Sequence, residues 1–157
     1  MTTASTDRHP GVTITRTFDA PRELVFAVWT DPKHMARWFG PRDFTNPVCE
    51  LDVRPGGAIL IHMRGPDGGI YPMKGAFQEV VPPERLVFTA AAFASEDGAF
   101  LLEDTTTVTF TEFDGKTELT MHAVVTKATP EAGGALAGME QGWNETLDKL
   151  ADYLARA

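Results

Sequence analysis

The sequence predicts an α+β domain in which a curved antiparallel sheet of about seven strands wraps around a long C-terminal helix. Between Val48 and Thr126, short runs rich in β-branched and aromatic residues are separated by Gly, Pro and Asp turns, as in successive strands. No helical pattern separates these runs, so the strands are expected to be joined by hairpins and to pair antiparallel. The last segment carries apolar residues at spacings of three and four, which predicts a helix covering one face of the sheet.

One strand and two short helices are predicted at the start of the domain. Val12–Phe18 alternates apolar residues with threonines, which is the period-two pattern of a half-buried strand. Pro21 suits the first turn of a helix, and an apolar stripe with helical spacing follows it: Leu24, Val25, Val28 and Trp29. Asp31-Pro32 is typical of an N-cap and first helical residue, so a second short helix should end near Trp38-Phe39-Gly40-Pro41.

Six further strands are expected after these helices. Turn signals separate them at Pro55-Gly56-Gly57, Gly65–Gly69 and Pro82-Pro83, and Asp114-Gly115 is the strongest hairpin signal in the chain. The expected strands are Val48–Val53, Ala58–Arg64, Ile70–Val81, Arg85–Ala92, Glu103–Phe113 and Thr117–Thr126.

An apolar cavity is expected between the curved sheet and the final helix, which is predicted from Thr129 to about Leu154. Alternation points a set of strand residues inward: Ile59, Ile61, Met63, Leu86, Phe88, Val108, Phe110, Leu119 and Met121. The final helix would face them with Met139, Trp143 and Leu147. Another group would close the mouth of the cavity: Trp38, Phe39, Met73, Phe93 and Phe100. The alternative is that all these residues form a solid core.

Composition limits the partners that the protein can have. Of the 157 residues, 43% are apolar and 23% are charged, which fits one globular domain. The net charge of −8 argues against nucleic acid and anionic membrane, because both need a basic surface. No stretch approaches the roughly 20 apolar residues that cross a bilayer, so no membrane insertion is expected. Residues 1–10 should form a flexible tail without a secretory signal, and 11–157 a single cytoplasmic domain.

The histidines and the single cysteine do not form a pattern typical of a metal site or a reactive thiol. The four histidines at positions 9, 34, 62 and 122 are scattered, and alternation places His62 and His122 on the outer face of the sheet. We therefore expect no metal site and no cofactor. Cys49 is the single cysteine, so it forms no disulfide within the chain, and we interpret it as a buried structural thiol.

A few polar residues are candidates for contact with the cavity. Glu103 is the candidate catalytic residue, together with its neighbour Asp104, because a carboxyl group buried beside aromatic rings has a raised pKa and can act as general acid or base. The alternative is a solvated strand end. Arg64 and Tyr71 flank a hairpin loop and could hydrogen-bond a ligand, although a surface ion pair of Arg64 with Asp67 is the preferred interpretation.

Motifs along nearly the whole chain resemble the SRPBCC (START-like) superfamily, in the branch named for activators of the heat-shock-protein-90 ATPase. The matching segments are Ile14–Pro21, Val25–Pro32, Arg37–Pro41, Asp52–Gly57, Met63–Gly68, Gly75–Phe77, Val81–Phe88 and Gly142-Trp143 with Leu147, Leu150 and Leu154. The resemblance implies the helix-grip fold and a tunnel for a ligand between the sheet and the C-terminal helix. It does not imply one activity, because related domains bind lipids or hormones, cyclise polyketides or assist a chaperone.

Three functions follow as hypotheses. The first is binding of a small apolar molecule, without catalysis, in the cavity between sheet and helix. The second is a cyclase or hydrolase that uses a cavity carboxylate such as Glu103. The third is a module that interacts with a chaperone, which rests on the family name. A homodimer is also compatible with apolar residues such as Leu60 and Val87 on the outer face of the sheet.

Overall fold

Seven strands form one antiparallel sheet in the computed structural model, which describes residues 11–40, 42–94, 100–128 and 139–156. Their order in the sheet is β1-β7-β6-β5-β4-β3-β2, so every neighbouring pair except β1 and β7 is joined by a hairpin or short loop. This confirms the predicted fold class. The strands are β1 Gly11–Phe18, β2 Thr45–Leu51, β3 Ala58–Arg64, β4 Ile70–Val81, β5 Arg85–Ala94, β6 Phe100–Phe113 and β7 Lys116–Ala128.

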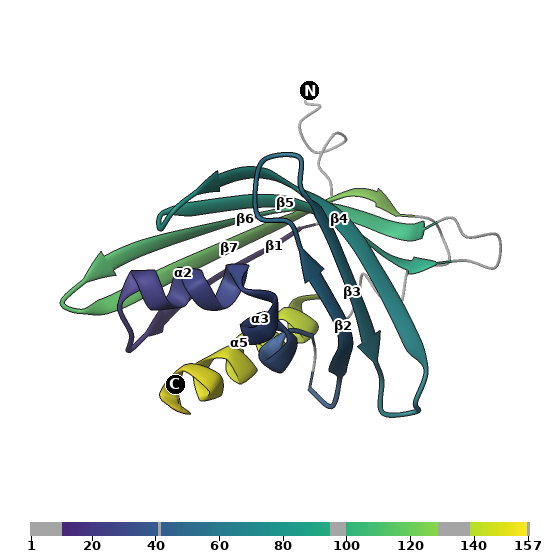
Figure 1. Ribbon diagram of the computed structural model, residues 1–157, viewed down its shortest axis with the longest axis horizontal. Helices are drawn as coiled ribbons and strands as arrows, with labels where there is room; N and C mark the ends of the chain where they lie inside the picture. The colour runs from purple at the N-terminus through teal and green to yellow at the C-terminus, as the bar shows by residue number, and fades with distance from the viewer. Residues whose placement is uncertain (1–10, 41, 95–99, 129–138, 157) are drawn as a thin grey trace, which may run out of the picture.

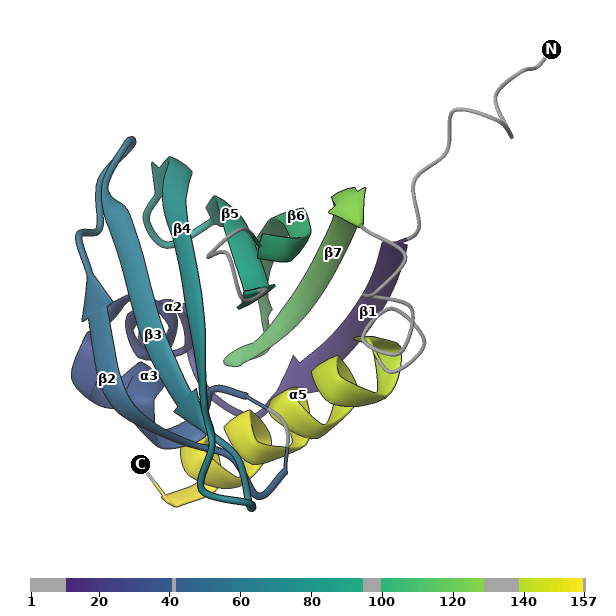
Figure 2. The same ribbon diagram turned by 90° about the vertical axis from the view of Figure 1, so that its right-hand side faces the viewer.

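Among the described residues, three helices are present, and they lie on the concave side of this sheet (Figures 1 and 2). The helices are α2 Arg22–Thr30, α3 Pro32–Trp38 and α5 Met139–Arg156. Asp31 caps α3 as predicted, because its side chain accepts a hydrogen bond of 2.9 Å from the backbone N–H of Lys33. Pro21, predicted in the first turn of a helix, is the N-cap of α2. The predicted start of the last helix and the predicted tail, 129–138 and 1–10, lie outside the described residues.

The strand β2 begins earlier than the sequence predicts. It starts at Thr45 instead of Val48, and its register with β3 shifts between these two residues. The difference arises at Pro47, which interrupts the sequence pattern but is tolerated here because β2 is an edge strand. The hairpin at Asp114-Gly115 is as predicted. Both residues have positive φ, 51° and 74°, as a two-residue turn between antiparallel strands such as β6 and β7 requires.

Side chains alternate along the strands between the buried concave face and the outer face of the sheet, as predicted. The predicted inward-facing residues are all buried in one core: Ile59, Ile61, Met63, Leu86, Phe88, Val108, Phe110, Leu119 and Met121. On the outer face, His122 is exposed and its Nδ1 lies 2.6 Å from Thr13 Oγ1. Leu60 is half-buried and Val87 is only 5% exposed, so these two residues offer less apolar surface to a second copy than the sequence predicts.

Candidate functional site

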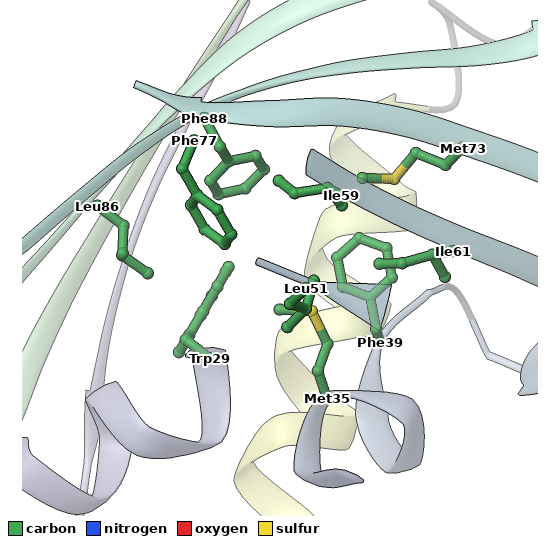
Figure 3. Close-up of a pocket in the computed structure, with 10 residues that line it drawn as sticks. All are labelled: Trp29, Met35, Phe39, Leu51, Ile59, Ile61, Met73, Phe77, Leu86 and Phe88. Atoms are coloured by element: carbon green, nitrogen blue, oxygen red, sulfur yellow. The ribbon is translucent and has the colours of Figure 1, made fainter. Parts of the chain in front are cut away.

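A pocket with an apolar lining lies on the concave side of the sheet, at the end covered by α2 and α3 (Figure 3). The sheet contributes residues from four strands, β2 to β5, and the helices close the pocket from the opposite side. Its lining consists of Trp29, Met35, Phe39, Leu51, Ile59, Ile61, Met73, Phe77, Leu86 and Phe88. None of these ten side chains is charged, so the pocket suits an apolar guest.

The free space in this pocket is small. It amounts to about 10 Å³, which is close to the size of one water-sized sphere. An organic molecule can therefore enter only if lining side chains move. Met35 and Met73 lie on opposite sides of the pocket, and methionine is the apolar side chain that adapts most easily to different neighbours.

Trp29 is the central ring of an aromatic cluster beside the pocket. It is fully buried, and its ring centroid lies 4.9 Å from that of Trp38 and 6.4 Å from that of Phe110, both in edge-to-face geometry. Trp143 of α5 stacks on it at 6.4 Å and also meets Phe39 edge-on at 6.1 Å. These distances are those of favourable aromatic pairs, so the cluster fixes α2, α3 and α5 relative to the sheet.

Four of the predicted ligand-binding residues line this pocket: Phe39, Ile61, Met73 and Phe88. Seven others belong to the same core, or pack against it, without lining the pocket: Trp38, Met63, Phe110, Met121, Met139, Trp143 and Leu147. The side chains of Phe93 and Phe100 lie outside the described part of the chain. This pocket thus lies between the sheet and helices α2 and α3, and none of its lining residues belongs to α5.

Sequence reasoning missed several lining residues. Trp29 and Met35 belong to the two short helices, from which we predicted only Trp38 and the adjacent Phe39 as cavity residues. Phe77 shares the face of Met73 four residues earlier on β4, so alternation alone would have found it. Leu51 ends β2 and pairs with Ile59, one of the predicted inward-facing residues.

Asp104, not Glu103, is the carboxylate on the concave face. It pairs with Ala90 and Val125, and its face also holds Thr106, which lies opposite the pocket residue Phe88. Burial raises the pKa of Asp104 to about 6, opposed by a 3.3 Å hydrogen bond that its Oδ1 accepts from Thr106 Oγ1. The prediction of a raised pKa therefore applies to this neighbour of Glu103.

Glu103 points to the outer face, because it alternates with Asp104. Its Oε2 lies 3.6 Å from Lys127 Nζ, and its side chain is 43% exposed. Both carboxylates border a second pocket, of about 320 Å³, that solvent can reach. The other residues around it are Lys74, Gly75, Thr89, Ala90, Ala91 and Thr126.

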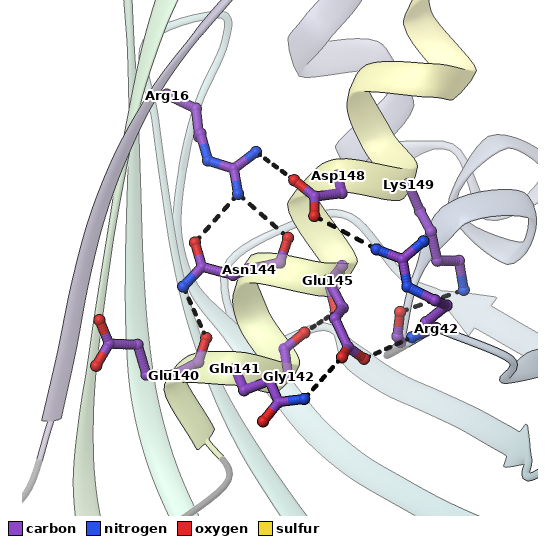
Figure 4. A network of polar contacts seen from close by, with 11 residues as sticks. Arg16, Arg42, Glu140, Gln141, Gly142, Asn144, Glu145, Asp148 and Lys149 are labelled. Carbon is purple, nitrogen blue, oxygen red and sulfur yellow. Dashed lines mark hydrogen bonds and ion pairs between the residues drawn. The ribbon is translucent and has the colours of Figure 1, made fainter.

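A polar network connects α5 to two other segments of the chain (Figure 4). Arg16 of β1 forms a 2.9 Å ion pair with Asp148 and donates to the side-chain oxygen of Asn144 at 3.1 Å. Arg42 lies 3.6 Å from the other oxygen of Asp148, and its backbone N–H donates to Glu145. These contacts tie both β1 and the segment between α3 and β2 to the final helix.

Lys149 of α5 also contacts the segment between α3 and β2, through hydrogen bonds to the backbone of this segment. Its half-buried Nζ donates to the backbone carbonyls of Phe39, Gly40 and Phe44 at 3.4, 3.2 and 3.1 Å. Burial is the main reason that the pKa of Lys149 is lowered, although Asp43 and Glu145 act in the opposite direction. Since Phe39 lines the pocket, α5 positions one of its walls through this lysine.

The remaining candidates have structural roles in the described residues. Asp67 accepts hydrogen bonds from the Gly69 N–H at 2.9 Å and the Tyr71 hydroxyl at 3.2 Å, and it forms no ion pair with Arg64 there. Cys49 is half-buried on β2, and burial raises the pKa of its thiol to about 11. Within the described ranges, no three His, Cys, Asp or Glu side chains gather to hold a metal ion.

No helix in the described part of the chain combines the length and apolarity that crossing a membrane requires. A curved antiparallel sheet with a C-terminal helix across its concave face, and an apolar pocket on that face, together define a helix-grip domain of the START-like class. The family described as activator of Hsp90 ATPase homolog 1-like protein matches residues 19–155. The chain therefore belongs to this family, whose fold is in general a ligand-binding fold.

Solved structures of bacterial proteins are similar over almost the entire chain. A protein from Nitrosomonas europaea is 25% identical with a TM-score of 0.79, covering 93% of this chain and 94% of that one. One from Arthrobacter aurescens is 27% identical with a TM-score of 0.81, covering 95% and 88%. One from Mycobacterium smegmatis is 28% identical with a TM-score of 0.76, covering 93% and 91%. No curated protein matches the chain.

Proposed function

We propose that this protein binds a small, largely apolar molecule in the pocket between the sheet and helices α2 and α3. The observation that carries the proposal is the lining itself: ten side chains, from α2, α3, the residue that follows α3 and strands β2 to β5, surround one pocket, and none of them is charged. Such a site selects a guest by burial of apolar surface, and membership of a ligand-binding fold family supports the same conclusion.

Binding requires the pocket to open, because about 10 Å³ of free space holds no organic molecule. The thioether chains of Met35 and Met73 can adopt other rotamers at low cost. A guest that fills the enlarged space replaces the contacts that these side chains lose. We therefore expect binding to be accompanied by side-chain rearrangement at the pocket and by little change in the sheet.

The test is displacement of an environment-sensitive fluorescent fatty acid, with native mass spectrometry of the purified protein to detect an occupant. Ile61→Phe adds volume inside the pocket and should weaken binding at least tenfold. Leu60→Phe is the matched control, because Leu60 is the preceding residue of the same strand and faces outward. If no lipid, aromatic or polyketide probe binds the unmodified protein, the proposal is wrong.

A second candidate function is general acid–base catalysis by Asp104. The raised pKa of this carboxyl and its place on the concave face favour it, because a group that titrates near 6 can both accept and donate a proton near neutral pH. Hydrolysis of activated aryl esters is the first assay. Asp104→Asn should abolish any turnover and Glu103→Gln should not, whereas absence of turnover by the unmodified protein removes this candidate.

A further inference from the structure

The second pocket lies on the outer face of the sheet, opposite the apolar pocket. Lys74 of β4, Ala91 of β5 and Glu103 of β6 all border it, and they are side by side in the register of these three strands. Successive residues of a strand point to opposite faces, and Met73, which precedes Lys74, lines the apolar pocket. The three side chains therefore point away from that pocket, and the sheet separates the two sites.

Small residues leave this part of the outer face hollow. Ala91 lies between the long side chains of Lys74 and Glu103 and is too short to fill the space between them. Gly75 also borders the pocket, and a Cβ atom there would lie 1.8 Å from the backbone oxygen of Thr89, so a larger residue does not fit. The resulting space of about 320 Å³ is at the lower end of the range for small-molecule sites.

The two hydroxyl groups at this pocket are already engaged with the backbone. Thr126 Oγ1 donates to the carbonyl of Glu103 at 3.2 Å, and Thr89 Oγ1 accepts from the N–H of Ala76 at 3.2 Å. The remaining polar side chains that border the pocket are one lysine and two carboxylates. Charge, rather than neutral hydrogen bonding, should therefore decide which molecules bind.

Charges of opposite sign lie on opposite sides of the pocket. The backbones of Lys74 and Glu103 are two strand spacings apart, or about 10 Å. Glu103 makes a loose ion pair with Lys127 at 3.6 Å, and in the described part of the chain the Lys74 ammonium has no ion-pair or hydrogen-bond partner. Asp104 adds a second carboxyl to the side of Glu103, although its own side chain lies toward the concave face.

We propose that this pocket binds a small zwitterion, such as an ω-amino acid or a short peptide, with its carboxylate facing Lys74 and its ammonium facing Glu103. The proposal concerns a second site and does not depend on the proposed function of the apolar pocket. A guest that carries only a carboxylate is repelled by Glu103, and one that carries only an ammonium is repelled by Lys74. A divalent cation is a poor alternative, because no three His, Cys, Asp or Glu side chains gather within the described ranges.

Three probes with the same carbon chain distinguish these guests. ε-Aminocaproate carries both charges, caproate only the carboxylate and hexylammonium only the ammonium. Titration followed by nitrogen-15 NMR at low ionic strength suits weak binding, because salt screens exposed charges. We expect ε-aminocaproate to shift the amide signals of Lys74, Ala91 and Glu103. It should bind at least about threefold more tightly than either singly charged probe.

Two substitutions assign each charge of the guest to its wall. Lys74→Met keeps the apolar stem but removes the ammonium, so ε-aminocaproate should lose its preference over hexylammonium. Glu103→Gln should remove the preference over caproate in the same way. Lys116→Met and Glu118→Gln are the matched controls, because both residues are exposed on β7 and neither borders the pocket. Both preferences should stay unchanged in these two variants.

Several outcomes would overturn the proposal. If caproate or hexylammonium binds as tightly as ε-aminocaproate, the pocket does not recognise a zwitterion. If the signals that shift belong to residues outside the pocket, or none shifts at the highest soluble concentration, the site is wrong. None of these results bears on the apolar pocket, which displacement of the fluorescent fatty acid tests separately. Loss of one preference in each pocket variant, with both controls unchanged, supports the proposal.

Discussion

The indole ring of Trp143 on α5 stacks on that of Trp29 on α2, with centroids 6.4 Å apart and planes inclined by only 16°. This pair joins the C-terminal helix to a residue that lines the apolar pocket. Because Trp143 also meets Phe39 edge-on, one side chain of α5 supports two pocket residues from two other elements. The final helix thus shapes the pocket through contacts behind its lining.

Replacing Trp143 should therefore lower stability and ligand affinity together. Trp143→Ala removes a large, partly buried ring from the aromatic cluster, and we expect a loss of about 2–3 kcal/mol in the free energy of unfolding. Urea denaturation followed by circular dichroism measures this loss. Trp143→Phe keeps an aromatic surface and should lose less than half as much. Equal losses in the two variants would show that ring stacking is unimportant here.

Lys149→Met should loosen the segment from Phe39 to Phe44. The change keeps the apolar stem but leaves backbone carbonyls without their cationic donor, so we expect a loss of about 1–2 kcal/mol in the free energy of unfolding. Amide hydrogen exchange should speed up in this segment. Probe affinity should also fall, because Phe39 is a pocket wall.

The matched control for this change is Lys116→Met. Lys116 is exposed as the first residue of β7, so its replacement should alter stability by no more than about 0.5 kcal/mol. Exchange rates near Phe39 that are the same in both variants would contradict a positioning role for Lys149.

Much of the fold is predictable because local patterns and the tertiary arrangement agree. Alternation identified the inward face of β3, β5, β6 and β7, and glycine-rich turns identified the hairpins. The exception is β2, where Pro47 suggests a break while the edge position tolerates it. That tolerance depends on the sheet order, which no local pattern encodes.

The site was harder to predict because it depends on how elements pack. The register explains why Asp104 rather than Glu103 faces inward: it aligns Asp104 with Ala90 and Val125 past a bulge at Glu103. Likewise, the sequence identifies Trp29 as a core residue of a helix, but the lack of an acceptor for its N–H among the described residues depends on three-dimensional neighbours. Both features follow from long-range contacts.

The thiol of Cys49 should react slowly while the protein is folded. Burial raises its pKa from 9.0 to about 11, so the reactive thiolate is scarce at pH 8. With about a hundredth of the thiolate, the folded protein should be alkylated about 100-fold more slowly than the unfolded chain. Iodoacetamide labelling with and without urea, read by mass spectrometry, measures this ratio. Equal rates in the two conditions would be evidence against burial of the thiol.

Asp104 should make stability depend on pH between about 4 and 6. Burial raises the pKa of its carboxyl from the ordinary 3.8 to about 6 in the folded protein, so the folded state binds the proton more tightly than the unfolded chain does. The resulting stabilisation is complete below pH 4 and is lost as pH rises through 6, by about 1–3 kcal/mol in total. Asp104→Asn imitates the protonated form, so it should be more stable than the unmodified protein above pH 7.

The difference between these two proteins should vanish below pH 4, where Asp104 is protonated and resembles asparagine. Urea titrations at pH 4, 6 and 8 measure it directly. Glu103→Gln controls for loss of a negative charge at the adjacent residue, and it should change stability little because the ion pair with Lys127 is exposed. A gain at pH 8 in Glu103→Gln as large as in Asp104→Asn would assign the effect to net charge. A gain confined to Asp104→Asn requires a carboxylate that is desolvated on the concave face.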